Sequence, residues 1–266
     1  MTTGRLSVLV VGATGSIGRL VVEEAGKRGH AVRALARDAR KAARLFPGVQ
    51  LVAGDLTSPD TLTQAVDGVD AVVFTHGSDD GGKAGPEQID YGGVRNVLAA
   101  LGGRSVRVAL MTAIGVTNRE GDYNRQTEAH DWKRRGERLV RVSGLPYTIV
   151  RPGWFDYNKS DEHHLVLLQG DRRHAGNPSD GVVARRQIAE VLVASLTSTE
   201  ALRKTFELVA TRGPAQHDLD AVFAELDADP PGAVDAVRDL PNMPPAEEPE
   251  RVRRDLAAAS SNSWNA

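Results

Sequence analysis

The fold is decided by the stretch Leu6-Ser-Val-Leu-Val-Val11, which runs directly into Gly12-Ala-Thr-Gly15-Ser-Ile-Gly18. The apolar run predicts a β-strand, and residues 16–28 carry apolar side chains at helical spacing, which predicts a helix. A second apolar run, at residues 31–36, predicts another strand. Residues 6–36 are therefore expected to form a β-α-β unit with a glycine-rich turn between its first strand and its helix.

The same alternation of strand and helix continues along the chain. Further strands are predicted at residues 49–53, 70–75, 106–112 and 147–150. Helices are predicted near residues 59–66, 86–101 and 125–142. Continuous apolar strands separated by helices are typical of a parallel sheet covered on both faces, and crossovers of one hand give a doubly wound architecture. We therefore predict an α/β protein with a doubly wound parallel sheet.

The last third of the chain is less regular. A loop-rich stretch, a helix and a strand are predicted at residues 152–181, 186–196 and 205–209, and we expect them to form a small substrate roof over the carboxyl edge of the sheet. From Gly213 onward, 7 of the 13 prolines occur and acidic residues outnumber basic ones 11 to 4. This composition predicts a short helix near 218–226 and then an extended acidic arm that wraps the domain, reaches a partner subunit or is partly disordered. We divide the chain into residues 1–212 and 213–266.

Composition narrows the possible classes of protein. The chain has 266 residues, 41% hydrophobic and 26% charged, with 35 acidic against 33 basic side chains. The formal net charge of −2 gives no reason to expect a nucleic-acid partner or an anionic membrane. No cysteine is present, which excludes disulfides and thiolate chemistry. The longest apolar runs are too short to span a bilayer, and the opening MTTGRL has no signal-peptide pattern, so we expect a cytoplasmic protein.

The glycine triplet predicts a nucleotide-binding loop. Gly12 suits a turn that other residues cannot adopt, Gly15 leaves room for a pyrophosphate, and Gly18 allows the helix to lie close to the strand. The amides of Ser16 and Ile17, at the positive end of the helix, then face the phosphates. A glycine triplet alone is weak evidence, but its place between the first strand and the first helix is the context that a dinucleotide site requires.

Residues at the ends of the second and third strands bear on the choice between NAD and NADP. Arg37 ends the second strand and can bind a 2′-phosphate through two hydrogen bonds, with Lys41 one helical turn further on. The alternative is that Asp38 binds a ribose hydroxyl while Arg37 is exposed. We favour NADP over NAD. Asp55, after the third strand, is expected to accept from the adenine amino group or to cap the next helix.

Four motifs in order carry a resemblance to a known family: Gly12-Ala-Thr-Gly15-Ser-Ile-Gly18, Ala34-Leu-Ala-Arg37, Gly54-Asp55-Leu56 and Leu145-Pro-Tyr-Thr-Ile-Val-Arg151-Pro152-Gly153. Over residues 5–212 the chain resembles the NmrA-like, NAD(P)-binding branch of the atypical short-chain dehydrogenases/reductases. The resemblance implies a Rossmann fold with NAD(P) across the carboxyl edge of its sheet. It also implies cofactor contacts from Thr14, Leu56, Thr75, His76, Gly77 and Pro152.

In that superfamily a Tyr, and a Lys four residues after it, carry the chemistry together with a Ser or Thr at the end of the fifth strand. The Tyr exchanges a proton with the substrate oxygen, and the Lys binds the nicotinamide ribose. Here Thr112 ends the fifth predicted strand, and Lys133 lies on the next helix, four residues before Glu137. The residue four positions before Lys133 is Ala129, so the family tyrosine is absent in this register.

Three side chains are candidates for the missing proton donor. His130 lies three residues before Lys133 on the same helix, and imidazole exchanges protons near neutral pH. Tyr123 lies in the loop that enters this helix and could swing over the nicotinamide, although loop tyrosines more often pack against the protein. Tyr157 lies where the substrate pocket is expected, although aromatic residues there are also typical of a pocket wall. The predicted catalytic residues are Thr112, Lys133, His130 and Tyr123.

Two further charged groups have simpler interpretations. The helix that carries Lys133 has a basic run made of Arg134, Arg135, Arg138 and Arg141. We expect this run to be an exposed helix face paired with Glu137, or a surface through which a homodimer forms. Residues 161–164 read Asp-Glu-His-His, but adjacent side chains point to different sides, so we expect a solvated loop and no metal site.

These observations predict an NADP(H)-dependent oxidoreductase that acts on a small carbonyl, alcohol or conjugated substrate. Thr112 and Lys133 favour this interpretation. Because the tyrosine is missing, two alternatives stay open: a non-catalytic, NADP-binding redox sensor that acts on a partner protein, and an epimerase on the same fold.

Overall fold

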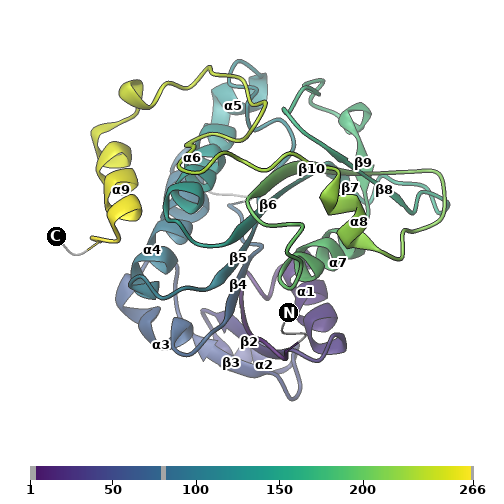
Figure 1. Cartoon of the computed structure of the whole chain (residues 1–266). Helices are drawn as coiled ribbons and strands as arrows, with labels where there is room; N and C mark the ends of the chain where they lie inside the picture. The colour runs from purple at the N-terminus through teal and green to yellow at the C-terminus, as the bar shows by residue number, and fades with distance from the viewer. Residues whose placement is uncertain (1–3, 79–81, 265–266) are drawn as a thin grey trace.

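A mostly parallel sheet runs through the computed structural model of the chain, in which residues 4–78 and 82–264 are described (Figure 1). Its strands are β1 (Ser7–Val11), β2 (Ala31–Ala36), β3 (Gln50–Ala53), β4 (Ala71–Phe74), β5 (Arg107–Met111), β6 (Tyr147–Pro152), β7 (Trp154–Phe155), β8 (His164–Leu168), β9 (Val182–Val183) and β10 (Lys204–Thr211). The order is β3-β2-β1-β4-β5-β6-β10-β9-β7, with β8 also paired to β10. Strands β3, β2, β1, β4, β5, β6 and β10 are parallel to one another, whereas β8 and β9 run antiparallel to β10. This order confirms the predicted doubly wound Rossmann sheet.

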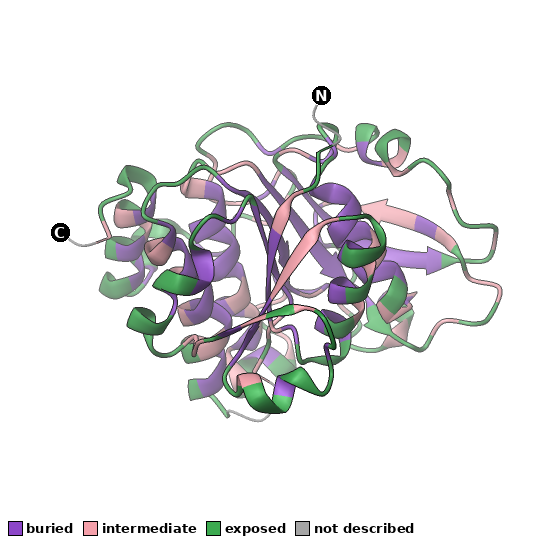
Figure 2. Cartoon of the chain, turned by 90° about the horizontal axis from the view of Figure 1, so that it is seen from below, coloured by how far each residue is buried: buried purple, intermediate pink, exposed green. Residues whose placement is uncertain are grey.

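Helices cover both faces of the sheet. They are α1 (Ser16–Lys27), α2 (Ala39–Ala43), α3 (Thr63–Val66), α4 (Gly92–Leu101), α5 (Asp122–Thr127), α6 (Ala129–Val142), α7 (Arg185–Ser195), α8 (Leu219–Ala224) and α9 (Glu250–Ser261). Helices α1, α2 and α7 pack on one face, and α3, α4, α6 and α9 pack on the other. Figure 2 shows the buried strands between helices whose outer surfaces are exposed. Among the described residues no helix is long and apolar enough to cross a membrane.

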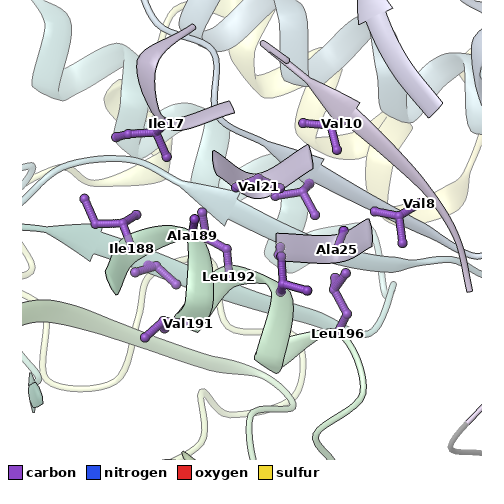
Figure 3. Close-up of a cluster of buried hydrophobic side chains, with 14 of the residues drawn as sticks. Val8, Val10, Ile17, Val21, Ala25, Ile188, Ala189, Val191, Leu192 and Leu196 are labelled. Carbon is purple, nitrogen blue, oxygen red and sulfur yellow. The ribbon is translucent and has the colours of Figure 1, made fainter. Parts of the chain in front are cut away.

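The packing of α1 against α7 shows why the first helix forms where the sequence predicts it. Ile17, Val21 and Ala25 recur at every fourth position, so they lie along one stripe of α1. That stripe meets Ile188 and Leu192 of α7, as Figure 3 shows, and all five side chains are buried. Burying each large aliphatic side chain contributes about 1.5–3 kcal/mol, so this contact holds the glycine loop at a fixed position over the sheet.

Three of the predicted helices are interrupted. The helix predicted at 125–142 divides into α5 and α6 because Glu128 adopts a left-handed backbone conformation with φ of 57°. The helix predicted at 86–101 begins as a π-helical turn at Pro86–Tyr91, and α4 follows it. The helix predicted at 59–66 is a 3₁₀ turn at Pro59–Thr61 followed by α3. Apolar periodicity does not reveal such breaks, because it is nearly the same on both sides of each one.

The C-terminal arm takes the first of its three expected courses and packs on the domain. After α8 it crosses beside α6 and ends in α9, which packs against α4 and α6 (Figure 1). Five of its acidic side chains form ion pairs or hydrogen bonds with residues of the domain, namely Asp229, Asp235, Asp239, Glu248 and Asp255. The division of the chain at residue 212 stays a prediction.

The prediction that the four arginines of α6 form an exposed face is wrong. Arg134, Arg138 and Arg141 have side chains that are 0% exposed, and Arg135 is 9% exposed. The arm covers them and supplies their counterions. Arg138 donates to Asp235 at 2.7 Å and to Glu248 at 2.6 Å, and Arg135 donates to Glu248 at 2.7 Å. The sequence alone concealed this arrangement because the acidic partners lie about 100 positions away.

The buried pairs predict a large cost when one partner is removed. Glu248→Ala leaves Arg135 and Arg138 buried without their shared carboxylate, so the free energy of unfolding should fall by about 3–5 kcal/mol. The matched control is Glu247→Ala, because Glu247 is an exposed neighbour and its loss should change stability by less than about 0.5 kcal/mol. Urea unfolding measured by circular dichroism gives both values. Equal stability of the two variants would show that the arm does not hold α6.

Candidate active site

A pocket of about 530 Å³ opens at the carboxyl edge of the sheet, where β1 to β5 end. Most of the residues predicted to bind the cofactor or carry the chemistry line it, namely Gly12, Thr14, Gly15, Ser16, Ile17, Arg37, Asp55, Leu56, Thr75, His76, Gly77, Thr112 and Lys133. These residues come from segments far apart in the sequence. They meet because the carboxyl ends of parallel strands share one edge of the sheet.

The other predicted residues lie outside the pocket lining. Gly18 lies under the loop, and Pro152 is buried at the end of β6. His130 packs against Tyr123, with 5.1 Å between their ring centroids, and neither lines the pocket. Tyr157 is 63% exposed. The structure therefore does not bring any of the three proposed proton donors into the pocket, and their roles stay predictions.

The glycine loop is shaped by close backbone contacts. Gly12 has a φ of 82°, and a Cβ atom there would lie 2.6 Å from the backbone nitrogen of His76. A Cβ atom on Gly18 would lie 2.1 Å from the carbonyl oxygen of Gly12. Only glycine fits at either position. Gly15 precedes α1 without a side-chain cap, so the first amides of this helix are available to an anion. The loop thus fits the phosphates of a dinucleotide.

Arg37 and Asp38, the two candidate ribose contacts at the end of β2, differ in their hydrogen-bond partners. The carboxylate of Asp38 accepts from the backbone amide of Lys41 at 2.9 Å and caps α2. Arg37 is exposed and lines the pocket, and within the described part of the chain its guanidinium forms no hydrogen bond or ion pair. Asp55 also lines the pocket, but its carboxylate accepts from Thr57 in a tight turn. The cap of the following 3₁₀ turn is Ser58, so the capping role expected for Asp55 is wrong.

At the other end of the pocket, Lys133 forms an ion pair that sequence reasoning missed. Its ammonium group contacts the carboxylate of Asp90, whose side chain is only 3% exposed, and Ser78 donates to the other oxygen of that carboxylate. Asp90 lies on the π-helical turn before α4, and such turns are frequent at functional sites. In the sequence it was one acidic residue within an amphipathic helix, so no local signal distinguished it.

His76 lies beside this ion pair. Both of its ring nitrogens are buried and neither has a hydrogen-bond partner among the described residues. Burial lowers its pKa to about 4, so the imidazole is neutral near pH 7. A small cavity of about 10 Å³ borders His76, Asp90, Thr112 and Lys133, which is close to the space that one water molecule needs.

Behind the pocket, Thr112 is tied to a buried ionic network. Its hydroxyl donates to Glu137 at 2.7 Å, and Glu137 accepts from Arg151 at 2.7 and 3.0 Å. Burial alone raises the pKa of Glu137, but Arg151 and Arg141 reverse this effect and hold its pKa at about 2. Glu137 is therefore ionised at physiological pH. The expectation that Glu137 lies on an exposed helix face is therefore wrong.

A second buried carboxyl in this network behaves differently. Glu207 on β10 accepts from the backbone amide of Asp171 at 3.1 Å and lies 3.4 Å from Arg151. Burial raises its pKa to about 8, in spite of Arg151, and Asp171 and Asp239 add to the increase. Arg151 already makes bidentate contacts with Glu137 and Asp239, so less of its charge is available to Glu207. Glu207 is therefore protonated at neutral pH.

Fold and site together define an NAD(P)-binding protein of the atypical short-chain dehydrogenase/reductase type. The chain belongs to the NAD(P)H-binding family, whose sequence profile matches residues 12–199. This result confirms the family resemblance read from the four motifs.

Individual proteins agree with this assignment. The chain is 26% identical to sanguinarine reductase from Eschscholzia californica, over 84% of this chain and 96% of that protein. The solved oxidoreductase ylbE from Lactococcus lactis superposes with a TM-score of 0.68 at 16% identity, covering 84% of this chain and 99% of that one. A short-chain dehydrogenase/reductase from Veillonella parvula, solved with NADP, gives a TM-score of 0.60 at 17% identity, with 81% and 100% covered. The predicted class of NAD(P)-dependent oxidoreductases is confirmed.

The raised pKa of Glu207 predicts how stability depends on pH. A carboxyl that titrates at 4.5 when unfolded and near 8 when folded adds stability below pH 4.5 that is lost as the pH rises to about 8. Glu207→Gln removes this dependence. The free energy of unfolding of the variant, relative to the original protein, should therefore rise by about 1–3 kcal/mol between pH 5 and pH 8.

Urea unfolding at several pH values measures this difference. Glu200→Gln is the control because Glu200 is exposed, and its curve should run parallel to that of the original protein. A parallel curve for Glu207→Gln as well would mean that Glu207 is ionised in the folded state.

Proposed function

We propose that the protein is an NADP(H)-dependent oxidoreductase that acts on a small carbonyl, alcohol or conjugated substrate. The observation that carries the proposal is one pocket with the glycine loop and Arg37, which has no partner among the described residues, at one end, and the ion pair of Lys133 with Asp90 at the other. When bound there, NADPH would supply a hydride to the substrate. The protein's own part is to orient both molecules and to stabilise charge on the substrate.

The preference for NADP rests on Arg37 and Asp38. An NAD-preferring site needs a carboxylate for the ribose hydroxyl, and the carboxylate of Asp38 is engaged in capping α2. The guanidinium of Arg37 is free of protein partners in the described residues and borders the pocket, which suits a 2′-phosphate. The NADP complex of the Veillonella parvula protein is consistent with this preference.

Lys133 has the most suitable side chain for charge stabilisation. An ammonium group has three N–H donors, and Asp90 takes one of them. The remaining donors can bind a ribose hydroxyl and the substrate oxygen, on which negative charge develops during reduction. Asp90 and its partner Ser78 fix the position of the ammonium group. We propose that Lys133, held in position by Asp90, takes over from the missing tyrosine the stabilisation of negative charge on the substrate oxygen.

An aromatic group beside the pocket supports a conjugated substrate. Trp154, Phe155 and Tyr157 are 38%, 39% and 63% exposed, and Phe155 lines the pocket. The rings of Trp154 and Tyr157 lie 6.2 Å apart in an edge-to-face arrangement. Three large exposed aromatic side chains within four residues offer apolar contact area for a conjugated substrate.

Two further expectations remain proposals. We propose a cytoplasmic protein with a small-molecule substrate. A homodimer also stays a prediction, but it has lost its main support. The arginine face of α6 on which it rested is covered by the arm of the same chain.

The choice of cofactor can be tested at Arg37. Arg37→Ala should weaken binding of NADPH by about 1.5–3 kcal/mol, the scale of a charge-assisted hydrogen bond, and leave NADH binding nearly unchanged. The quenching of intrinsic fluorescence gives both dissociation constants. Arg40→Ala is the control, because Arg40 is exposed nearby and does not line the pocket. Equal weakening of NADPH and NADH would argue against a 2′-phosphate contact.

The catalytic proposal can be tested at Lys133. Lys133→Ala should lower kcat by one to a few orders of magnitude and weaken NADPH binding only modestly. The double variant Asp90→Asn/Lys133→Met removes the ion pair without leaving a buried charge, and it should show the same loss. Lys27→Ala, on the surface of α1, is the control. Turnover is measured on a panel of aldehydes, quinones and enones. NADPH binding without turnover on any of them would contradict the enzyme and support a cofactor sensor.

A further inference from the structure

The hydroxyl of Thr112 has one proton, which it donates in a hydrogen bond to the side chain of Glu137. The hydroxyl lies 2.7 Å from Glu137, and both side chains are buried. Glu137 is ionised, because Arg151 and Arg141 keep its pKa far below neutrality. An ionised carboxylate only accepts hydrogen bonds, so Thr112 must be the donor in this pair. What remains available on its oxygen is acceptor capacity.

This acceptor belongs to a residue of the ligand pocket. Thr112 lines both the pocket of about 530 Å³ and the small cavity beside Lys133. No protein group in the described residues donates to its hydroxyl oxygen. Lys133 is a donor only, because an ammonium group has no lone pair. The two side chains therefore present opposite hydrogen-bonding characters to a molecule in the pocket.

Glu137 is held by Arg141 at 2.9 Å and by Arg151, and Arg151 in turn contacts a residue of the C-terminal arm. Arg151 extends from β6, and its side chain is 0% exposed. It forms ion pairs with two carboxylates, those of Glu137 and Asp239. It donates to Glu137 at 2.7 and 3.0 Å and to Asp239 at 2.7 and 2.8 Å. Two bidentate contacts fix the plane of a guanidinium group. Asp239 thus holds Arg151, Arg151 holds Glu137, and Glu137 turns the proton of Thr112 away from the pocket.

We infer that Thr112 serves as a hydrogen-bond acceptor for a ligand N–H or O–H group, and that Asp239 of the C-terminal arm is a positioning residue that sets this polarity. The inference rests on the proposed function and deepens it. It assigns the polarisation of a carbonyl oxygen to Lys133 and not to Thr112. It also makes the arm, which lies outside the pocket, a component of the active site.

Two molecules could supply the donor. One is the cofactor, through the N–H₂ group of its nicotinamide carboxamide, and the other is the substrate, through an alcohol hydroxyl. The shared chemistry is a hydrogen-bond donor opposite the end of β5. The two sources differ in which measurement responds to the loss of Thr112, namely cofactor binding or the KM for an alcohol.

The test compares NADPH with its reduced 3-acetylpyridine analogue, in which a methyl group replaces the carboxamide N–H₂. If the cofactor is the donor, the original protein should bind the analogue roughly 3- to 10-fold more weakly than NADPH. Thr112→Val, which removes the acceptor at nearly constant volume, should bring this ratio close to 1. Thr112→Ser keeps the hydroxyl and should keep the ratio. If the substrate is the donor, Thr112→Val should instead raise the KM for an alcohol roughly 3- to 10-fold.

The role of the arm is tested by a matched pair of variants. Asp239→Asn weakens the contact with Arg151. It should therefore produce at least half of the change that Thr112→Val produces, either in the ratio of analogue to NADPH affinity or in the KM for an alcohol. Asp235→Asn is the control, because Asp235 also pairs with buried arginines of α6 but does not contact Arg151. Its loss should lower the melting temperature without changing the ratio or the KM. Equal effects of the two variants would overturn the positioning role of Asp239.

The outcomes separate this inference from the proposed function. A protein that binds neither NADPH nor the analogue overturns the proposed function, and the inference falls with it. A protein that binds both, with a ratio and an alcohol KM that do not respond to Thr112→Val, overturns the inference alone. A response to Thr112→Val that Thr112→Ser does not share supports the acceptor.

Discussion

The neutralisation of the cationic face of α6 by carboxylates of the C-terminal arm is the interaction on which the rest of this structure depends. Arginine side chains that are 0% exposed, such as Arg134 and Arg138, are tolerated in a protein interior only when each is paired and hydrogen-bonded. The arm supplies Asp235 and Glu248 for this purpose. These ion pairs hold α6 in place against the sheet, and they thereby fix the positions of residues on its other faces.

Two of those residues reach the ligand pocket or its wall. Lys133 extends from α6 to Asp90 on the π-helical turn, and Glu137, one helical turn later, extends to Thr112 at the end of β5. The same helix therefore connects the arm, the strand edge and the pocket. Under the inference drawn above, a substitution at Asp239 would act on Thr112 through Arg151 and Glu137.

The sequence predicted the sheet and the tight glycine turn well, because both depend on local patterns. Alternating apolar strands and helices imply the doubly wound order, and Gly12 and Gly18 occupy positions where any Cβ atom would collide with backbone. The catalytic end was predicted less completely. Asp90 carried no local signal, and His130, proposed from helical spacing, packs against Tyr123 outside the pocket lining.

By itself, therefore, the sequence determined the Rossmann sheet, the glycine loop and the family, since each follows from residues that are neighbours along the chain. Only the tertiary structure decided that the arginines of α6 are buried, that Asp90 meets Lys133, and that Glu137 takes the proton of Thr112. The physical reason is that a charged residue is exposed or buried according to its partner. For Arg138, the partners Asp235 and Glu248 lie 97 and 110 residues away, beyond any periodicity that a sequence displays.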